Sequence, residues 1–279
     1  MAIIEIKDVV KAYIPGETVI DHIDLDIELG EFVVLLGSSG CGKTTLLKLI
    51  NKLIDFEHGT ISVKGKDIND WDTIALRRSI GYVIQQIGLL PHLTIEDNIT
   101  YVLSLEKKSV QEKKVRAREL IDLLGFDESF LKRYPRELSG GQRQRIGVAR
   151  ALAANPDIIL MDEPFGAVDE IARNALQDEL ISLHQQLKKT IIFVTHDIAE
   201  ALKLGTKIVL LRDGKIEQQG TKESLIFEPK TPFVEEFFGI KGFTSILDER
   251  IMSNVYQQVL CGSMTLKDLY TALHVEPEC

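Results

Sequence analysis

"GSSGCGKTT", Gly37 to Thr45, lies between the apolar run "FVVLL" and the helix-forming run "LLKLINKLI". The stretch matches the pattern G-x-x-x-x-G-K-[ST] at every specified position, in the order of strand, loop and helix that the pattern requires. Glycines let the backbone wrap closely around phosphate oxygens, and the amino end of the following helix adds partial positive charge. The stretch therefore predicts a phosphate-binding loop in an α/β fold. The alternative is a glycine-rich turn that binds no ligand.

The side chains of this loop have separate expected roles. Lys43 can reach the β and γ phosphates, the Thr44 hydroxyl can bind Mg²⁺, and Thr45 is a further phosphate contact. Cys41 fills a free position of the loop and has no expected chemistry of its own. The predicted nucleotide-binding residues of the loop are Gly37, Ser38, Ser39, Gly40, Cys41, Gly42, Lys43, Thr44 and Thr45.

The apolar runs of the chain predict two kinds of strand. Alternation of apolar and polar residues is typical of half-buried antiparallel strands, whereas continuous apolar runs are typical of parallel strands covered on both faces. The first kind comprises "IIEIKDVV" and "IDHIDLDIEL", and the second comprises "FVVLLG", "DIILMDEP", "TIIFVTHD" and "KIVLLRDG". Three of the continuous runs end in polar, glycine or acidic residues, at the edge where open α/β sheets bind their ligands.

Between about residues 88 and 155 the pattern becomes helical, as in "SVQEKKVRARELIDLLGF". Apolar residues recur there at roughly helical spacing. They are Val110, Val115, Leu120, Ile121 and Leu124. This segment predicts a helical subdomain inserted into the α/β core.

Composition excludes several classes of protein. The formal net charge of −9 over 279 residues gives no broad basic field, so a nucleic-acid partner is not expected. The three cysteines are odd in number and widely spaced, which fits a reducing compartment better than a disulfide framework, and their spacing does not indicate a zinc site. The amino-terminal segment lacks the continuous apolar core of a signal peptide, and we expect no membrane span in this chain.

A second acidic element, "IILMDEP", ends in two adjacent carboxylates. At the ligand edge of a sheet, Asp162 would hold Mg²⁺, and Glu163 would position an attacking water molecule. The alternative for this pair is the capping of a helix by an acidic residue at the end of a strand. The complete phosphate-binding loop elsewhere in the chain favours the catalytic interpretation.

Together these residues resemble the ATP-binding cassette ATPases of ABC transporters, over about residues 3–240. The most specific match is "LSGGQ", Leu138 to Gln142, which equals the family signature at each letter. The resemblance implies that two subunits pack head to tail, so that the signature of one faces the phosphate loop of the other and two ATP molecules lie between them. Its expected nucleotide contacts are Ser139, Gly140, Gly141 and Gln142. Taken alone, this string could also be a serine N-cap followed by a flexible first helical turn.

The resemblance assigns further residues one at a time. Tyr13 corresponds to the aromatic residue that stacks on adenine just before the first β hairpin, although it could simply pack on an edge strand. Gln85 corresponds to the glutamine that contacts Mg²⁺ or the attacking water, with the adjacent Gln86 as a weaker candidate and a solvent-facing amide as the alternative. His196 corresponds to the switch histidine that contacts the γ-phosphate, although a lone histidine is often structural.

Asp169 corresponds to the aspartate of the loop that crosses the dimer seam. The leucine usual before it is Val168 here, and a helix N-cap is the alternative role for the aspartate. The expected catalytic residues are therefore Glu163, His196 and Gln85, and the expected ligands of Mg²⁺ are Thr44, Gln85 and Asp162.

The fold implied by the resemblance is α/β: an ABC ATPase fold with a RecA-like P-loop core, an N-terminal antiparallel β subdomain and an inserted α-helical subdomain. The ATPase domain would occupy residues 1–240, and residues 241–279 would form a short helical extension, too short for a pair of CBS domains. ATP and Mg²⁺ are the expected cofactors. A homodimer would lie on the cytoplasmic face of the membrane, bound to permease subunits near "IGLLPHL" and served indirectly by an extracellular substrate-binding protein.

Several stretches are similar to importers of osmoprotectant quaternary amines such as glycine betaine, choline and carnitine. They are "RYPRELSGGQRQR", "FGAVDEIAR" and "GYVIQQIGLLPHLTIEDNI". An importer of another small solute, such as an amino acid or a related betaine, is the alternative. A cassette ATPase acting on DNA ends or ribosomes would have a long coiled-coil insertion or two cassettes in tandem, and a P-loop kinase would have no use for the signature. An inactive nucleotide-binding adaptor should lack Lys43, Glu163 or His196, all of which are present.

Overall fold

The computed structural model describes residues 2–85, 88–166, 168 and 170–239. Its contacts divide the chain into two units, Met1–Lys222 and Glu223–Cys279. The described part of the second unit contains most of α9 (Lys222–Phe227) and a further helical run over 232–239. The predicted extension over 241–279 lies outside the described residues, and the predicted boundary near residue 240 stays a prediction.

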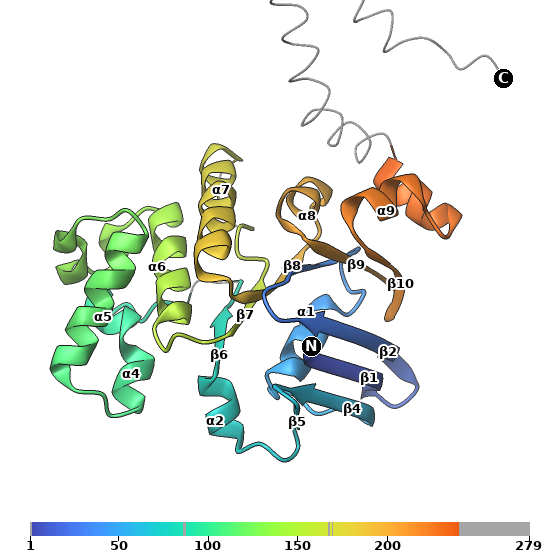
Figure 1. Cartoon of the computed structure of the whole chain (residues 1–279), viewed down its shortest axis with the longest axis horizontal. Helices are drawn as coiled ribbons and strands as arrows, with labels where there is room; N and C mark the ends of the chain where they lie inside the picture. Colours follow the sequence, from blue (N-terminus) through green and yellow to red (C-terminus); the bar gives the residue numbers. More distant parts are fainter. Residues whose placement is uncertain (1, 86–87, 167, 169, 240–279) are drawn as a thin grey trace, which may run out of the picture. The chain divides into compact units, whose positions relative to one another are not determined.

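The amino-terminal hairpin belongs to an antiparallel sheet (Figure 1). The strand order is β2-β1-β4-β5, and all three pairings are antiparallel. Ile4, Ile6 and Val9 of β1 are buried while Lys7 is exposed, so the predicted antiparallel strands with one covered face are confirmed. The strand bounds are β1 (Ala2–Ile14), β2 (Glu17–Glu28), β4 (His58–Val63) and β5 (Lys66–Asp67).

The continuous apolar runs form the centre of a second sheet, ordered β10-β9-β3-β8-β7-β6. All neighbouring strands from β9 to β6 are parallel, and every residue of β3, β7 and β8 is buried. The edge strand β10 pairs antiparallel with β9, so the sheet is mixed. The bounds are β3 (Phe32–Leu36), β6 (Ile80–Val83), β7 (Ile158–Asp162), β8 (Thr190–Thr195), β9 (Lys207–Arg212) and β10 (Lys215–Gly220).

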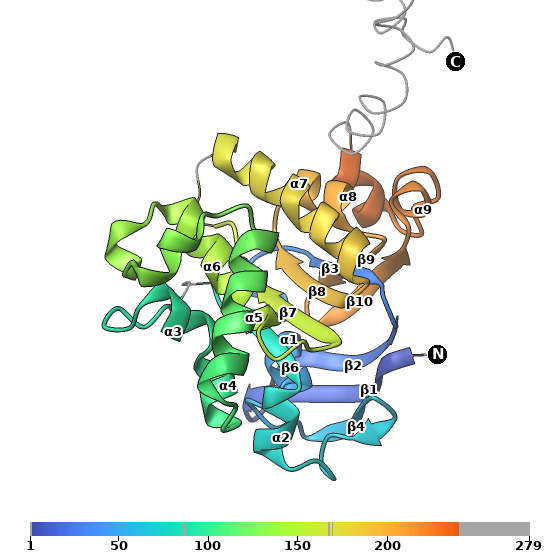
Figure 2. The ribbon, with the colours of Figure 1, turned by 60° about the vertical axis from the view of Figure 1, so that its left-hand side comes forward.

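A group of helices lies in sequence between β6 and β7. Figure 1 and Figure 2 place α4, α5 and α6 together beyond the β6 edge of the sheet, as an inserted helical subdomain. The bounds are α3 (Ile95–Ile99), α4 (Tyr101–Leu105), α5 (Val110–Leu123), η1 (Glu128–Lys132), η2 (Pro135–Glu137) and α6 (Gly140–Leu152). Within the described ranges, none of the helices has the length and apolar character that crossing a membrane requires.

The helical pattern predicted in "SVQEKKVRARELIDLLGF" is observed as α5. Of the five apolar residues that carry this pattern, Leu120, Ile121 and Leu124 are buried, whereas Val110 and Val115 are exposed. Val115 precedes the buried Ala117 by two residues, which is a rotation of about 200° around the helix axis. Its side chain therefore lies on the side of the helix opposite to Ala117. Val110 is the first residue of the helix and directly follows the N-cap Ser109.

The remaining helices cover the two faces of the second sheet. Helix α1 (Lys43–Ile50) lies between the sheets, where Leu46 and Leu47 share one core with residues of both. The opposite face is covered by helices that include α8 (Ile198–Leu204), which packs on β3 and β8. Helix α2 (Thr73–Arg78) packs on β6, and α7 (Glu170–Leu187) packs on α6 and α8.

Because Leu46 is completely buried between the sheets, its truncation is expected to destabilise the whole unit. We expect Leu46→Ala to lower the free energy of unfolding by about 2–5 kcal/mol. Ile74→Ala is the control, since Ile74 is 58% exposed and should change stability by less than about 1 kcal/mol. Urea unfolding followed by circular dichroism measures both variants. Equal midpoints for the two would contradict a core shared by the two sheets.

Candidate nucleotide site

The phosphate loop depends on glycine at its two ends. A Cβ on Gly37 would lie 2.3 Å from the Leu211 carbonyl oxygen, and one on Gly42 would lie 2.8 Å from the Val19 carbonyl oxygen. Gly42 also has φ of 105°, which L side chains rarely adopt, where the chain enters α1. The loop therefore fits between β9 and the hairpin only with glycine at these positions.

Lys43 folds back over the loop from which it starts. Its Nζ donates to the carbonyl oxygens of Gly37 and Ser38, both at 2.8 Å, and lies 3.8 Å from Cys41 Sγ. Cys41 is buried and belongs to the core. The ammonium group is thus held at the inner wall of the loop, beside the start of α1.

Two side chains that carry oxygen atoms, the expected ligands of Mg²⁺, lie together where α1 meets the end of β7. The Thr44 hydroxyl donates to Asp162 Oδ1 at 2.7 Å. Burial raises the pKa of Asp162, opposed by this hydrogen bond and assisted by the neighbouring Glu163. A hydroxyl and a carboxylate are hard oxygen donors of the kind that Mg²⁺ prefers, so these residues fit the expected ion. Among the described residues no group of three or more His, Cys, Asp or Glu side chains could hold a metal by itself.

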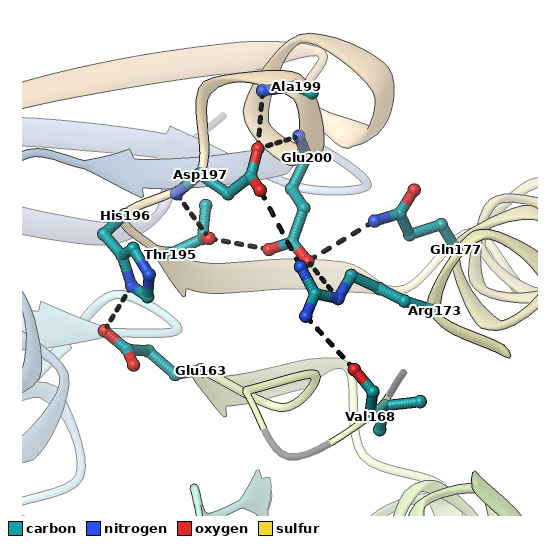
Figure 3. A network of polar contacts seen from close by, with 9 residues as sticks. All are labelled: Glu163, Val168, Arg173, Gln177, Thr195, His196, Asp197, Ala199 and Glu200. Carbon is teal, nitrogen blue, oxygen red and sulfur yellow. Dashed lines mark hydrogen bonds and ion pairs between the residues drawn. The ribbon is translucent and has the colours of Figure 1, made fainter. Parts of the chain in front are cut away.

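Glu163 brings the three expected catalytic residues together. Its Oε2 accepts a hydrogen bond from Gln85 Nε2 at 3.1 Å, and its Oε1 lies 3.2 Å from His196 Nδ1 (Figure 3). The parallel pairing of β7 with β8 sets Asp162 opposite Val194, so the residues just beyond both strands meet at one edge. Glu163 has φ of 41°, an uncommon conformation for a residue with a side chain. The weaker candidate Gln86 lies outside the described residues.

Tyr13 lies beside the phosphate loop with its ring available. Its hydroxyl is 3.3 Å from Thr45 Oγ1, the Lys11 ammonium lies 5.5 Å from the ring centroid, and the residue is 55% exposed. The residue lies inside the first strand of the hairpin, one position before its end, and not ahead of the hairpin. The open ring face is compatible with stacking on a base.

The signature residues begin α6, apart from the loop of the same chain. Ser139 caps the helix: its Oγ accepts from the Gln142 amide at 3.2 Å, and Gln142 Oε1 accepts from the Ser139 amide at 2.9 Å. Helix α6 packs on β6, α3, α5 and α7, whereas α1 packs on β2, β7 and β8. The structure therefore does not unite the signature with the phosphate loop of its own chain. Asp169 lies outside the described residues.

A polar network behind His196 was missed by the sequence analysis. It consists of Arg173, Gln177, Thr195, Asp197 and Glu200. In "HDIAEAL" the acidic residue three positions after Asp197 looks like an ordinary surface residue of a first helical turn. Its burial arises from α7, which is distant in sequence, so only the spacing of Asp197 and Glu200 after a buried strand could have indicated it.

Comparisons with known proteins agree on one family. The ABC transporter family profile matches residues 20–166. The chain is 52% identical over 236 residues to a glycine betaine/carnitine/choline transport ATP-binding protein of Bacillus subtilis, covering 85% of this chain and 62% of that protein. It is 45% identical over 261 residues to a glycine betaine uptake system ATP-binding protein of Escherichia coli, covering 91% of this chain and 85% of that protein.

Solved structures give the same result. A dimeric ATP-binding cassette in a post-hydrolysis state, bound to ADP and Pi, superposes with a TM-score of 0.69 at 37% identity, covering 78% of this chain and 98% of that chain. The chain spans 58–62% of the length of several of its osmoprotectant-transport relatives. Together with the phosphate loop, the "LSGGQ" signature and the mixed α/β fold, these matches show that the chain belongs to the ABC transporter family.

Proposed function

We propose that this chain is the ATP-hydrolysing subunit of an ABC importer for an osmoprotectant quaternary amine such as glycine betaine, choline or carnitine. The observation that carries the proposal is the Glu163 carboxylate, placed between Gln85 and His196 beside Thr44 and Asp162. The solute class is supported by the names of the relatives, which are ATP-binding proteins for transport of these amines.

The residues divide the hydrolysis of ATP among them. Backbone amides of the phosphate loop and the Lys43 ammonium bind the β and γ phosphates, with phosphate oxygens replacing the loop carbonyls as acceptors for Lys43. Thr44 and Asp162 would hold Mg²⁺, which neutralises charge on the phosphate oxygens. Glu163 accepts a proton from the attacking water, while Gln85 and His196 hold that carboxylate in place and contact the water and the γ-phosphate.

A second copy of the chain would complete the site. Because Ser139 and the amides that follow it begin a helix away from the phosphate loop of the same chain, they can serve the nucleotide of a partner. The dimeric form of the similar solved cassettes supports this arrangement. We propose ATP and Mg²⁺ as ligands, a homodimer, permease subunits that anchor it at the cytoplasmic face of the membrane, and an extracellular binding protein that delivers the solute.

The segment following Gln85 is the proposed permease contact. Ile87 lies outside the described residues, but residues 88–93 are fixed to α3 by the buried Asn98, whose amide nitrogen donates to the carbonyl oxygens of Leu90 and Leu93 at 3.0 and 3.1 Å. Leu90 and Leu93 remain partly exposed. A fixed, partly apolar surface next to Gln85 is suited to receive a helix from a membrane subunit.

Uptake measurements test the proposal as a whole. Cells carrying this chain with its permease are expected to accumulate radiolabelled glycine betaine, choline or carnitine under osmotic stress, and cells carrying Glu163→Gln in its place should accumulate about 10²-fold less. A labelled amino acid and trimethylamine N-oxide serve as comparison solutes. Uptake of only the comparison solutes would reject the proposed solute class, and wild-type protein that does not hydrolyse Mg-ATP would reject the enzymatic role.

A further inference from the structure

A carboxylate is buried behind the catalytic edge without a direct part in the chemistry described above. Glu200, in α8, is 6% exposed. Its Oε2 accepts from the Thr195 hydroxyl at 2.6 Å, and its Oε1 accepts from Gln177 at 3.4 Å. Burial raises the pKa of Glu200, which means that placing a charge there is costly. Helix α8 alone gives no reason for a buried acid at this position.

The same hydroxyl fixes the turn that carries His196. Thr195 Oγ1 donates to Glu200 and also accepts from the Asp197 amide at 3.0 Å. Asp197 is the N-cap of α8, and its Oδ1 accepts a hydrogen bond from the Ala199 amide at 2.8 Å. His196 is therefore held from the residue before it and from the residue after it.

One guanidinium group joins this turn to the loop that follows Glu163. Arg173, in α7, donates from Nη2 to the Val168 carbonyl oxygen at 3.1 Å. Its Nη1 lies 3.8 Å from Asp197 Oδ2, and its Nε lies 3.9 Å from Glu200 Oε1. Figure 3 shows Arg173 between the Val168 carbonyl group on one side and the two carboxylates on the other. The planar guanidinium group holds its donors on three separate nitrogens in fixed directions, whereas the three donors of a lysine share one nitrogen and cannot span the same partners.

A cavity links this network to the expected catalytic residues. It has a volume of about 70 Å³, and Glu163, His196, Arg173 and Glu200 are among its lining residues. The buried Nε of Arg173 has no hydrogen-bond acceptor within the described part of the chain. The cavity is lined by both charged and apolar groups and is large enough for water, which would bridge Nε to Glu200.

We propose that Arg173 is a positioning residue for ATP hydrolysis, acting by tying the loop after Glu163 to the turn that carries His196 through Asp197 and Glu200. The inference rests on the proposed hydrolytic function. Arg173 contacts neither the phosphate loop nor the Thr44 and Asp162 pair in the described structure. Its loss should therefore disturb the geometry of Glu163 and His196 while nucleotide binding stays intact.

The test compares Arg173→Met with Lys203→Met. Lys203 also joins α8 to α7, through an ion pair with Asp178 at 2.7 Å, but it does not contact Val168 or the cavity. We expect Arg173→Met to lower kcat for Mg-ATP roughly 10- to 100-fold, as a small misplacement of catalytic groups does. The KM and the Kd for a fluorescent ATP analogue should change less than about twofold, and Lys203→Met should leave kcat within about twofold of wild type. The kcat of Arg173→Lys should lie between that of Arg173→Met and that of wild type.

Arg173→Met leaves the buried Glu200 carboxylate without its neighbouring cation, which is expected to lower the stability of the fold. A double variant therefore separates lost stability from lost positioning. Arg173→Met with Glu200→Gln removes both charges and should melt near the wild-type temperature while kcat stays low. A folded single or double variant with wild-type kcat would overturn the inference, as would equal losses of kcat in Arg173→Met and Lys203→Met. Wild-type protein without ATPase activity would instead reject the proposed function, and the inference with it.

Discussion

Replacing Glu163 by glutamine is expected to lower ATP turnover by about 10²- to 10⁴-fold, the range typical of removing a general base. Glutamine keeps the size and shape of the side chain, and it can still exchange hydrogen bonds with Gln85 and His196. It cannot accept the proton of the attacking water at neutral pH. The variant should therefore bind Mg-ATP without hydrolysing it, and an ATP-dependent dimer should persist.

Two measurements check this expectation on the same protein. Phosphate release gives turnover, and sedimentation with and without Mg-ATP gives the state of association. Glu119→Gln, which neutralises an acid on the exposed side of α5, is the control and should behave as wild type. A monomeric Glu163→Gln protein with high residual activity would contradict both the role of Glu163 as base and the dimer.

A bulky residue at position 139 is expected to abolish the ATP-dependent dimer. In the Glu163→Gln background, Ser139→Arg places a long side chain where we propose that the γ-phosphate of the partner's ATP binds. The matched control is Ser109→Arg, because Ser109 caps α5 with the same reciprocal capping box that Ser139 forms at α6. Each substitution removes one helix cap and should cost about 1 kcal/mol of stability.

Sedimentation with Mg-ATP separates capping from nucleotide contact. Only the Ser139→Arg protein should remain monomeric, while Ser109→Arg should dimerise as its parent does. If both proteins dimerise, the signature does not contact the partner's nucleotide. If neither does, lost stability and not lost contact explains the result.

The phosphate loop and the central strands could be predicted because local signals determine them. The glycines at positions 37 and 42 occur where the backbone of β9 and the hairpin leaves no space for a Cβ. The spacing of these glycines in the sequence pattern therefore reflects a steric requirement of the fold. The order of β3, β7 and β8 then brings Glu163 and His196 to one edge. Their mutual contact follows from strand register, which the sequence pattern implies only indirectly.

Other features depend on contacts between distant segments. The buried state of Glu200 requires Gln177 and Arg173 from α7, and the exposed state of Val115 requires that α5 face its neighbours through Ala117 and Leu120. The antiparallel edge strand β10 likewise has a mixed polar sequence, "KIEQQG", that gives a weak signal. Neither a local motif nor periodicity alone contains this information.

The two hydrogen bonds from Lys43 to the loop carbonyls have a consequence for nucleotide recognition. They fix the lysine side chain against the loop, so the ammonium group is held at the wall where we propose that phosphate binds. Bound phosphate would replace the two carbonyl oxygens as acceptors for the lysine. The net affinity contributed by the lysine would then be the difference in free energy between its hydrogen bonds to phosphate and those to the loop. Because two hydrogen bonds must be given up, the lysine would contribute less affinity than an ammonium group with no partners in the loop.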